Sequence, residues 1–183
     1  MGRLQLCFMR YIGGFILSDM QKVLLIFMVA ALAASCGKEK PKDIVVNAVP
    51  STRNEMPPLV ATQTDDEKIS FKELKGKVLI VFFNPDCDHC QRNGKLMSQN
   101  KDVFSGYQVY FVTPDQMPAI AKFAVDYDLL DSNFHFARSE PADIFNSVGA
   151  ISSLPTFFSF NEQLLVGRIE GETTIEKLRS ILK

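Results

Sequence analysis

The chain has 183 residues and a formal net charge of −1, so its charge does not indicate nucleic acid or another strongly charged partner. Apolar residues make up 46 % and charged residues 22 %, as in ordinary globular proteins, and the length favours one domain with additional sequence. Two histidines and no tryptophan leave few candidates for a metal site, and we expect neither a metal nor another cofactor.

The N-terminal segment has the three-part pattern of a secretory signal peptide. Lys22 provides a short basic region after Met20, residues 23–32 are an unbroken apolar stretch, and small residues follow up to Cys36. The apolar stretch is shorter than the roughly 20 residues that a membrane-spanning helix needs. We therefore predict a signal peptide over residues 1–35, with Met20 favoured as the translation start. One long interrupted anchor and a buried helix are the alternative interpretations.

The sequence A-A-S-C that ends at Cys36 resembles the lipobox of bacterial lipoproteins, with Ala33 in place of the usual leucine. In that family the cysteine becomes the first residue and carries the lipid, so the resemblance implies that Cys36 attaches the protein to a membrane. Two or more acyl chains hold firmly, because each buried CH₂ contributes about 0.8 kcal/mol. Residues 36–58 are then a lipidated cysteine with a polar, proline-containing tether, and residues 59–183 are the folded domain.

The first part of the domain contains one strong strand signal. Residues 68–71 are a short alternating piece that leads into one helical turn. Residues 77–83 (KVLIVFF) are a continuous run of β-forming residues, which predicts a strand buried on both faces. A helix is expected over residues 88–104, with Gly94 as a weak point inside it.

The second part continues the alternation of strands and helices. Further strands are expected over residues 107–112, 134–137, 156–160 and 164–169. Further helices are expected over residues 116–127 and 141–148, and from Thr173 or Thr174 onwards. The alternation implies parallel strands covered by helices, and the last two strands form an antiparallel hairpin. The fold class is therefore α/β, with a central mixed sheet and helices on both faces.

The sharpest chemical signal is the C-x-x-C pair of Cys87 and Cys90 at the junction of a predicted strand and a predicted helix. A helix N-terminus carries unpaired N–H groups and about half a positive charge, which stabilises a thiolate. Cys87 is therefore expected to be exposed and nucleophilic, and Cys90 to close a disulfide with it. His89, when protonated, would stabilise the thiolate further, whereas Asp86 and Asp88 would disfavour it. The residues alone leave this balance open.

Over residues 57–183 the chain resembles the TlpA-like group of thioredoxin-fold oxidoreductases of the bacterial envelope. The resemblance rests on the K-G-K-V entry to the first long strand, the C-x-x-C, the inserted helix and strand, and the L-P-T-F sequence that begins at Leu154. It implies a thioredoxin-like fold in which Pro155 is a cis-proline that faces the dithiol. Leu154, Pro155 and Thr156 would then form the groove for the substrate strand.

The same resemblance implies an envelope-anchored thiol–disulfide oxidoreductase that reduces or exchanges the disulfides of client proteins, with its domain on the periplasmic side. Cys87 would attack a client disulfide, or be attacked by a client thiolate, and Cys90 would resolve the mixed disulfide. A membrane redox partner would complete the cycle. The client, this partner, the direction of electron flow, the membrane that holds the lipid and the oligomeric state stay open.

Several positions depart from the family pattern. Asp86 replaces the tryptophan that precedes the first cysteine in thioredoxins, and Val81 replaces an aspartate of the preceding strand. Asn93 replaces a glutamate that TlpA-like proteins often carry shortly after the second cysteine. The usual proton-accepting acids are therefore missing, which concerns the rate and direction of exchange. The hairpin turn at residues 161–163 lacks the usual glycine, so its turn type stays open.

Two other functions compete with the oxidoreductase. Cys87, His89 and Cys90 could hold Cu(I), because soft thiolates select this ion, although copper-delivering proteins of this fold commonly have one more residue between the cysteines. A thiol peroxidase is the third interpretation, but peroxidases of this fold place a threonine where this chain has Asn84.

The same residues also allow structural interpretations. Half of a zinc site is disfavoured because no second cysteine pair is present once Cys36 is lipidated. A static disulfide is disfavoured by its position at a helix start. His89 could be an ordinary surface residue, Asp86 and Asp88 could be helix caps, and His135 is expected to be a packing or surface residue.

Overall fold

The computed structural model describes residues 54–182, so the predicted signal peptide, Cys36 and most of the tether lie outside the described residues. The strands are β1 (Val60–Gln63), β2 (Lys68–Ser70), β3 (Lys77–Phe82), β4 (Gln108–Thr113), β5 (Phe134–Arg138), β6 (Thr156–Asn161) and β7 (Leu164–Glu170). The α-helices are α2 (Asp88–Ser98), α3 (Met117–Asp126), α4 (Pro141–Val148) and α5 (Ile175–Ile181), and the 3₁₀ turns are η2 (Phe71–Glu73) and η3 (Lys101–Phe104). Within this part of the chain, no helix has the length and apolar character needed to cross a membrane.

The strands form one mixed sheet in the order β2-β1-β5-β4-β3-β6-β7. The central strands β3, β4 and β5 are parallel, and β6 and β7 form the expected antiparallel hairpin. Phe82, at the end of β3, pairs with Val112 of β4 and with Thr156 of β6. The carboxyl ends of β3 and β4 therefore meet the amino end of β6 at one end of the sheet, where the dithiol follows β3.

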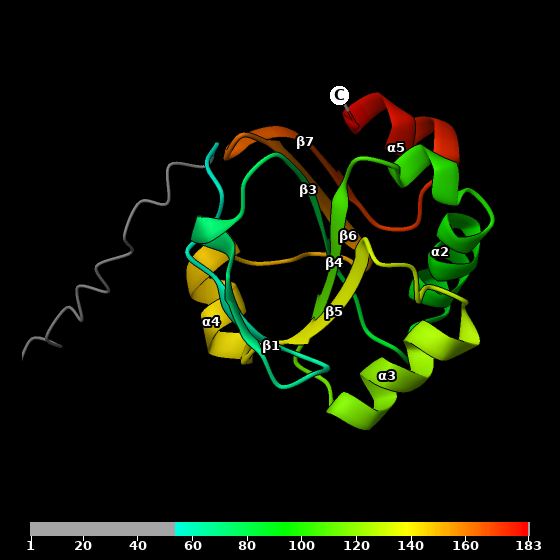
Figure 1. Ribbon diagram of the computed structural model, residues 1–183, viewed down its shortest axis with the longest axis horizontal. Coiled ribbons are helices and arrows are strands. Elements are labelled where there is room, and N and C mark those ends of the chain that lie inside the picture. The colour runs from blue at the N-terminus through cyan, green and yellow to red at the C-terminus, as the bar shows by residue number, and fades with distance from the viewer. Residues whose placement is uncertain (1–53, 183) are drawn as a thin grey trace, which may run out of the picture. The chain divides into compact units, whose positions relative to one another are not determined.

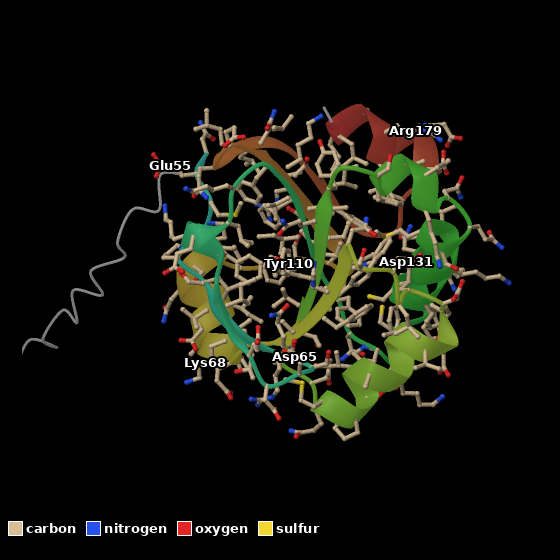
Figure 2. The ribbon with its side chains drawn as sticks, in the orientation of Figure 1. Glu55, Asp65, Lys68, Tyr110, Asp131 and Arg179 are labelled. Carbon is tan, nitrogen blue, oxygen red and sulfur yellow. The ribbon has the colours of Figure 1, made fainter. Side chains whose placement is uncertain are left out.

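The sheet separates two cores. Leu79 and Val81 of β3 face the core that includes α2, α3 and α5, whereas Ile80 and Phe82 face the core that includes α4. Figure 1 shows α2, α3 and α5 on one side of the sheet and α4 on the other. Figure 2 shows Tyr110, a buried residue of the α4 core, near the middle of the molecule. The predicted thioredoxin-like α/β fold, with a mixed sheet and helices on both faces, is confirmed.

The prediction of one helix over residues 88–104 is wrong in its second half. α2 ends at Ser98, and Asn100 leaves the helical conformation with φ −134° and ψ 41° while its side chain donates to the carbonyl of Leu96. The separate turn η3 follows. Gly94 has a packing role, because a Cβ atom there would lie 2.8 Å from Cζ of Phe123 in α3.

Two features near the edges of the sheet were not predicted. β1 is short and has no clear alternation in its sequence, and it forms by pairing with β2 and β5. In the β6–β7 turn, Glu162 (φ 46°) and Gln163 (φ 72°) both adopt the left-handed conformation. Two successive left-handed residues are typical of a type I′ hairpin, so this turn forms without the glycine that is usual in the family.

Candidate active site

The dithiol lies at the junction of β3 and α2. Cys87 is the N-cap residue of α2, with extended backbone, and Cys90 lies in the first turn of the helix. Cys87 is partly exposed, whereas Cys90 is only 2 % exposed, and both thiols are free. The first sulfur is therefore accessible at the positive end of the helix, and the second lies behind it.

Burial controls the chemistry of the second thiol. Desolvation is the main reason that the pKa of Cys90 is raised to about 12, and a hydrogen bond and Coulombic interaction with Cys87 act in the same direction. The backbone N–H of Asn84 donates to Cys90 Sγ over 3.5 Å and lowers this pKa. At neutral pH, Cys90 therefore retains its proton in the reduced dithiol, and Cys87 is the sulfur available for attack.

Asn84 organises the turn that leads into the dithiol. Its Oδ1 accepts from the N–H of Asp86 over 2.8 Å, and its carbonyl accepts from the N–H of Cys87 over 3.2 Å. Its Nδ2 donates to Oδ2 of Asp115 over 3.1 Å. The turn is thus fixed both to itself and to the loop that follows β4.

His89 belongs to a charged surface group that the sequence did not predict. Its Nδ1 lies 2.5 Å from Oε2 of Glu172, and Nε of Arg92 donates to Oε1 of Glu172 over 2.7 Å. Arg92 is the main cause, and His89 the second, of the lowering of the Glu172 pKa to about 2. The i, i+3 spacing of His89 and Arg92 is visible in the sequence, but Glu172 is about 80 residues away and no local signal connects it with them.

The other polar candidates have simpler roles in the structure. Asp86 and Asp88 are exposed, and neither supplies a side-chain cap to α2, so the helix-cap interpretation is wrong. Asp88 lies in the first turn, where a carboxylate interacts favourably with the helix dipole. His135 stacks on Tyr110 with ring centroids 4.6 Å apart, and burial lowers the pKa of His135. A packing role for His135 agrees with this geometry.

The predicted groove segment lies at the same end of the sheet as the dithiol, because Thr156 pairs with Phe82. The Leu154–Pro155 peptide bond is cis, as the resemblance implied. Thr156 Oγ1 donates to the carbonyl of Ser153 over 2.5 Å. Leu154 packs against both cores. The three residues are thus held from several sides, close in the fold to the start of α2.

Asn93, which stands where related proteins often carry an acid, joins α2 to the loop between β7 and α5. Its Nδ2 donates to the carbonyl of Thr173 over 2.9 Å, and its Oδ1 accepts from the N–H of Thr173 over 3.0 Å. The side chain is buried. An amide makes both bonds at neutral pH, whereas an ionised carboxylate has no donor.

The described chain offers no ready-made metal centre. Over residues 54–182, no three side chains among histidine, cysteine, aspartate and glutamate are grouped so that they could hold a metal ion. The sulfurs of Cys87 and Cys90 are the soft donors of the site.

The mixed sheet, the helices on both faces and the dithiol at a helix start define a protein of the thioredoxin-like class. Residues 52–168 match the AhpC/TSA family. The chain belongs to this family.

Relatives and solved structures agree with this class. The chain is 29 % identical over 134 residues to the thiol-disulfide oxidoreductase ResA of Bacillus thuringiensis subsp. konkukian. The matched region covers 70 % of this chain and 75 % of the relative. The same values hold for ResA of Bacillus cereus strain ATCC 10987. These similarities confirm the predicted class of thioredoxin-fold, TlpA-like thiol–disulfide oxidoreductases.

Among solved structures, dsbF of MTB has a TM-score of 0.58 at 18 % identity. The superposed region covers 68 % of this chain and 92 % of the dsbF chain. StoA of Bacillus subtilis has a TM-score of 0.54 at 18 % identity, with 68 % and 96 % covered. The copper-bound ScoI of Arabidopsis thaliana has a TM-score of 0.54 at 13 % identity, with 68 % and 92 % covered. These three likenesses support the fold.

Proposed function

We propose that this protein is an envelope-anchored thiol–disulfide oxidoreductase in which Cys87 and Cys90 carry out exchange with client proteins. The observation that carries the proposal is the pairing of an accessible thiol at a helix N-terminus with a buried free thiol one turn away. Such a pair combines a nucleophile with an internal resolving group. The chain's relationship to proteins named thiol-disulfide oxidoreductase supports the same chemistry.

In the reducing direction, the thiolate of Cys87 attacks one sulfur of a client disulfide. The client S–S bond breaks, a mixed disulfide forms and the other client sulfur leaves as a thiolate. Cys90 then releases its proton to solvent and attacks Sγ of Cys87, which expels the first client sulfur and leaves a Cys87–Cys90 disulfide. The client has gained two electrons from the dithiol, and the oxidising direction runs through the same steps in reverse.

The segment from Leu154 to Thr156 is the proposed contact surface for the client backbone. The burial of Pro155 and Thr156, together with the hydrogen bond from the N–H of Gly171 to the carbonyl of Pro155 (2.8 Å), supports a fixed geometry for this segment. A preorganised segment beside the reactive sulfur would orient an extended client chain at low entropic cost.

Cys36 is the proposed point of attachment to the membrane. The signal-like residues that precede it and the A-A-S-C sequence support an acyl anchor and a domain on the periplasmic side. Clients and a membrane redox partner would then be proteins of the same compartment.

The first test uses the full chain with Cys7→Ser and Cys36→Ser, so that the dithiol supplies the only thiols. Turnover of an insulin-type disulfide substrate is expected in this background. Adding Cys87→Ser is expected to abolish turnover, and adding Cys90→Ser to trap the client as a mixed disulfide on Cys87. Exchange at the unmutated rate in the Cys87→Ser chain would disprove the assignment.

The reduction potential decides the direction of electron flow and separates the competing functions. Thiol trapping in glutathione or dithiothreitol buffers should give a potential of about −270 mV for a reductant, or of about −120 mV for an oxidant. A dithiol that forms no reversible disulfide at any poise, but binds one Cu(I) per chain, would instead establish the copper function. Rapid oxidation by peroxide without client exchange would establish the peroxidase.

A further inference from the structure

The resolving step places negative charge on the buried sulfur of Cys90, and this charge needs a hydrogen-bond donor close by. Cys90 is buried, and its thiol must lose a proton and carry negative charge as it attacks Cys87. The backbone N–H of Asn84, which lies before the helix, donates a hydrogen bond to Cys90 Sγ. The position of this N–H therefore affects how well the site stabilises charge on that sulfur.

Asp115 holds the residue that provides this donor. Oδ2 of Asp115 accepts from Nδ2 of Asn84 over 3.1 Å and from Oγ1 of Thr113 over 2.6 Å. The N–H of Asp115 in turn donates to Oγ1 of Thr113 over 3.3 Å. Thr113 is fully buried at the end of β4, so the carboxylate is fixed to the sheet.

The arrangement connects two strand ends through side chains. One residue separates Asn84 from the end of β3, one residue separates Asp115 from the end of β4, and these strands are paired in parallel. The N–H of Phe83 donates to the carbonyl of Val112 over 3.1 Å, which extends the pairing to the residue before Asn84. Asp115 is thus the point where the sheet fixes the orientation of the Asn84 side chain.

We propose that Asp115 is a positioning residue of the dithiol, which orients Asn84 so that the Asn84 N–H stays on Cys90 Sγ during the resolving step. The inference rests on the proposed function. Since Asn84 donates to Cys90, and Cys87 makes the first attack, loss of Asp115 should slow resolution and leave formation of the mixed disulfide nearly unchanged.

One substitution at Asp115 can separate the effect of its hydrogen bonds from the effect of its negative charge. Both donors reach the same oxygen of Asp115, so the single carbonyl oxygen of an asparagine can accept both bonds. Asp115→Asn therefore removes the charge and keeps the contacts, whereas Asp115→Ala removes both. Asn84→Ala removes the other partner of the same bond, and Asp143→Ala, at an exposed position in the first turn of α4, is the matched control.

The experiment follows both steps in one stopped-flow trace. The full chain with Cys7→Ser and Cys36→Ser is reduced and mixed with an aromatic disulfide whose thiolate product is coloured. Cys87 releases one coloured thiolate by attacking the reagent, and this phase depends on reagent concentration. Cys90 releases the second by attacking the mixed disulfide, and this phase does not depend on reagent concentration.

We expect Asp115→Ala to slow the second phase by about tenfold, because a small misplacement of a stabilising group has a large effect on rate. Asp115→Asn should stay within about threefold of the unmutated rate, and the double variant Asp115→Ala/Asn84→Ala should be no slower than the slower single variant. An unchanged first phase shows that each variant is folded.

Three results would overturn the inference: an unmutated second phase in Asp115→Ala, an Asp115→Asn chain as slow as Asp115→Ala, or equal slowing by Asp143→Ala. The second of these would assign the effect to charge. Absence of both phases in the unmutated chain would instead disprove the proposed function, so the two failures are distinguishable.

Discussion

Two asparagines, Asn84 and Asn93, bond the dithiol region to the rest of the domain. Asn84 joins it to the loop after β4, and Asn93 joins α2 to Thr173 with one donor and one acceptor. In the sequence, Asn93 departs from the family pattern because it stands where TlpA-like proteins often carry a glutamate. In the structure, its buried amide both donates and accepts, so an acid at this position would lower the stability of the fold.

Asn93→Asp is expected to lower the free energy of unfolding at neutral pH by roughly 1–3 kcal/mol, because the buried carbonyl of Thr173 loses its donor and faces a carboxylate. At acidic pH the new carboxyl can be protonated and can donate again, so the difference from the unmutated chain should shrink. Chemical denaturation at several pH values measures this. Asn146→Asp, at an exposed position of α4, should show little effect; equal losses at both positions would contradict the argument.

Glu172 gives a pH dependence whose sign follows from its ion pairs. Arg92 first, and His89 second, lower its pKa from 4.5 to about 2 in the folded chain. Its contribution to stability is therefore present above pH 4.5 and is lost as the pH falls towards about 2. The difference in thermal midpoint between the unmutated chain and Glu172→Gln should vanish across this window. Glu73→Gln, at an exposed glutamate of η2, should give no such trend, and a difference that grows on acidification would contradict the assignment.

At the scale of elements, α5 lies directly on β7. Gly167 of β7 faces Ile181 of α5, and a Cβ atom at Gly167 would lie 2.5 Å from Cγ2 and 2.6 Å from Cβ of Ile181. Ile181 is largely buried in the core shared with α2. The absence of a side chain at Gly167 therefore sets how closely the last helix approaches the sheet.

Gly167→Ala is expected to lower the free energy of unfolding by roughly 1–3 kcal/mol, because the added methyl group overpacks this contact. The measurement is denaturant unfolding of the single variant, of Ile181→Ala and of the double variant. The double variant should lose less than the sum of the single losses, since Ile181→Ala vacates the space that the new methyl group needs. Strict additivity would show that the two positions are not coupled.

At the scale of the whole molecule, one end of the sheet gathers segments that are distant in sequence. The dithiol turn follows β3, Asp115 follows β4, the cis-proline segment precedes β6 and Glu172 follows β7. The strand order places β3 between β4 and β6, so the dithiol is flanked on both sides. The seven-stranded sheet thus provides a rigid support for a site composed largely of loops.

The proposed anchor gives a prediction for the whole chain in its cell. Cys36→Ser should move the protein from the membrane fraction to the soluble fraction of the envelope, because the acyl chains supply the apolar area that holds it on the bilayer. Cys7→Ser is the matched control and should leave the protein with the membrane, since Cys7 precedes the expected cleavage site. Fractionation followed by detection of the chain measures both, and membrane retention of Cys36→Ser would contradict the lipid anchor.

The sequence by itself determined the features that depend on neighbours along the chain. The run of β-forming residues before Cys87, the helix that begins at Pro141 and the hairpin near Asn161 follow from local pattern and steric preference. The placement of the dithiol at the start of a helix follows in the same way, because strand and helix signals adjoin it directly.

The tertiary structure decided the features that depend on contacts between distant segments. β1 exists through pairing with β2 and β5, and Glu172 reaches His89 across 83 residues. Asn93 meets Thr173 only where α2 packs beside the β7–α5 loop, and Asp115 meets Asn84 only where the loop after β4 lies beside the turn after β3. Hydrogen bonds and ion pairs form wherever donors and acceptors meet in space, and local sequence preferences carry no record of which distant partner will be there.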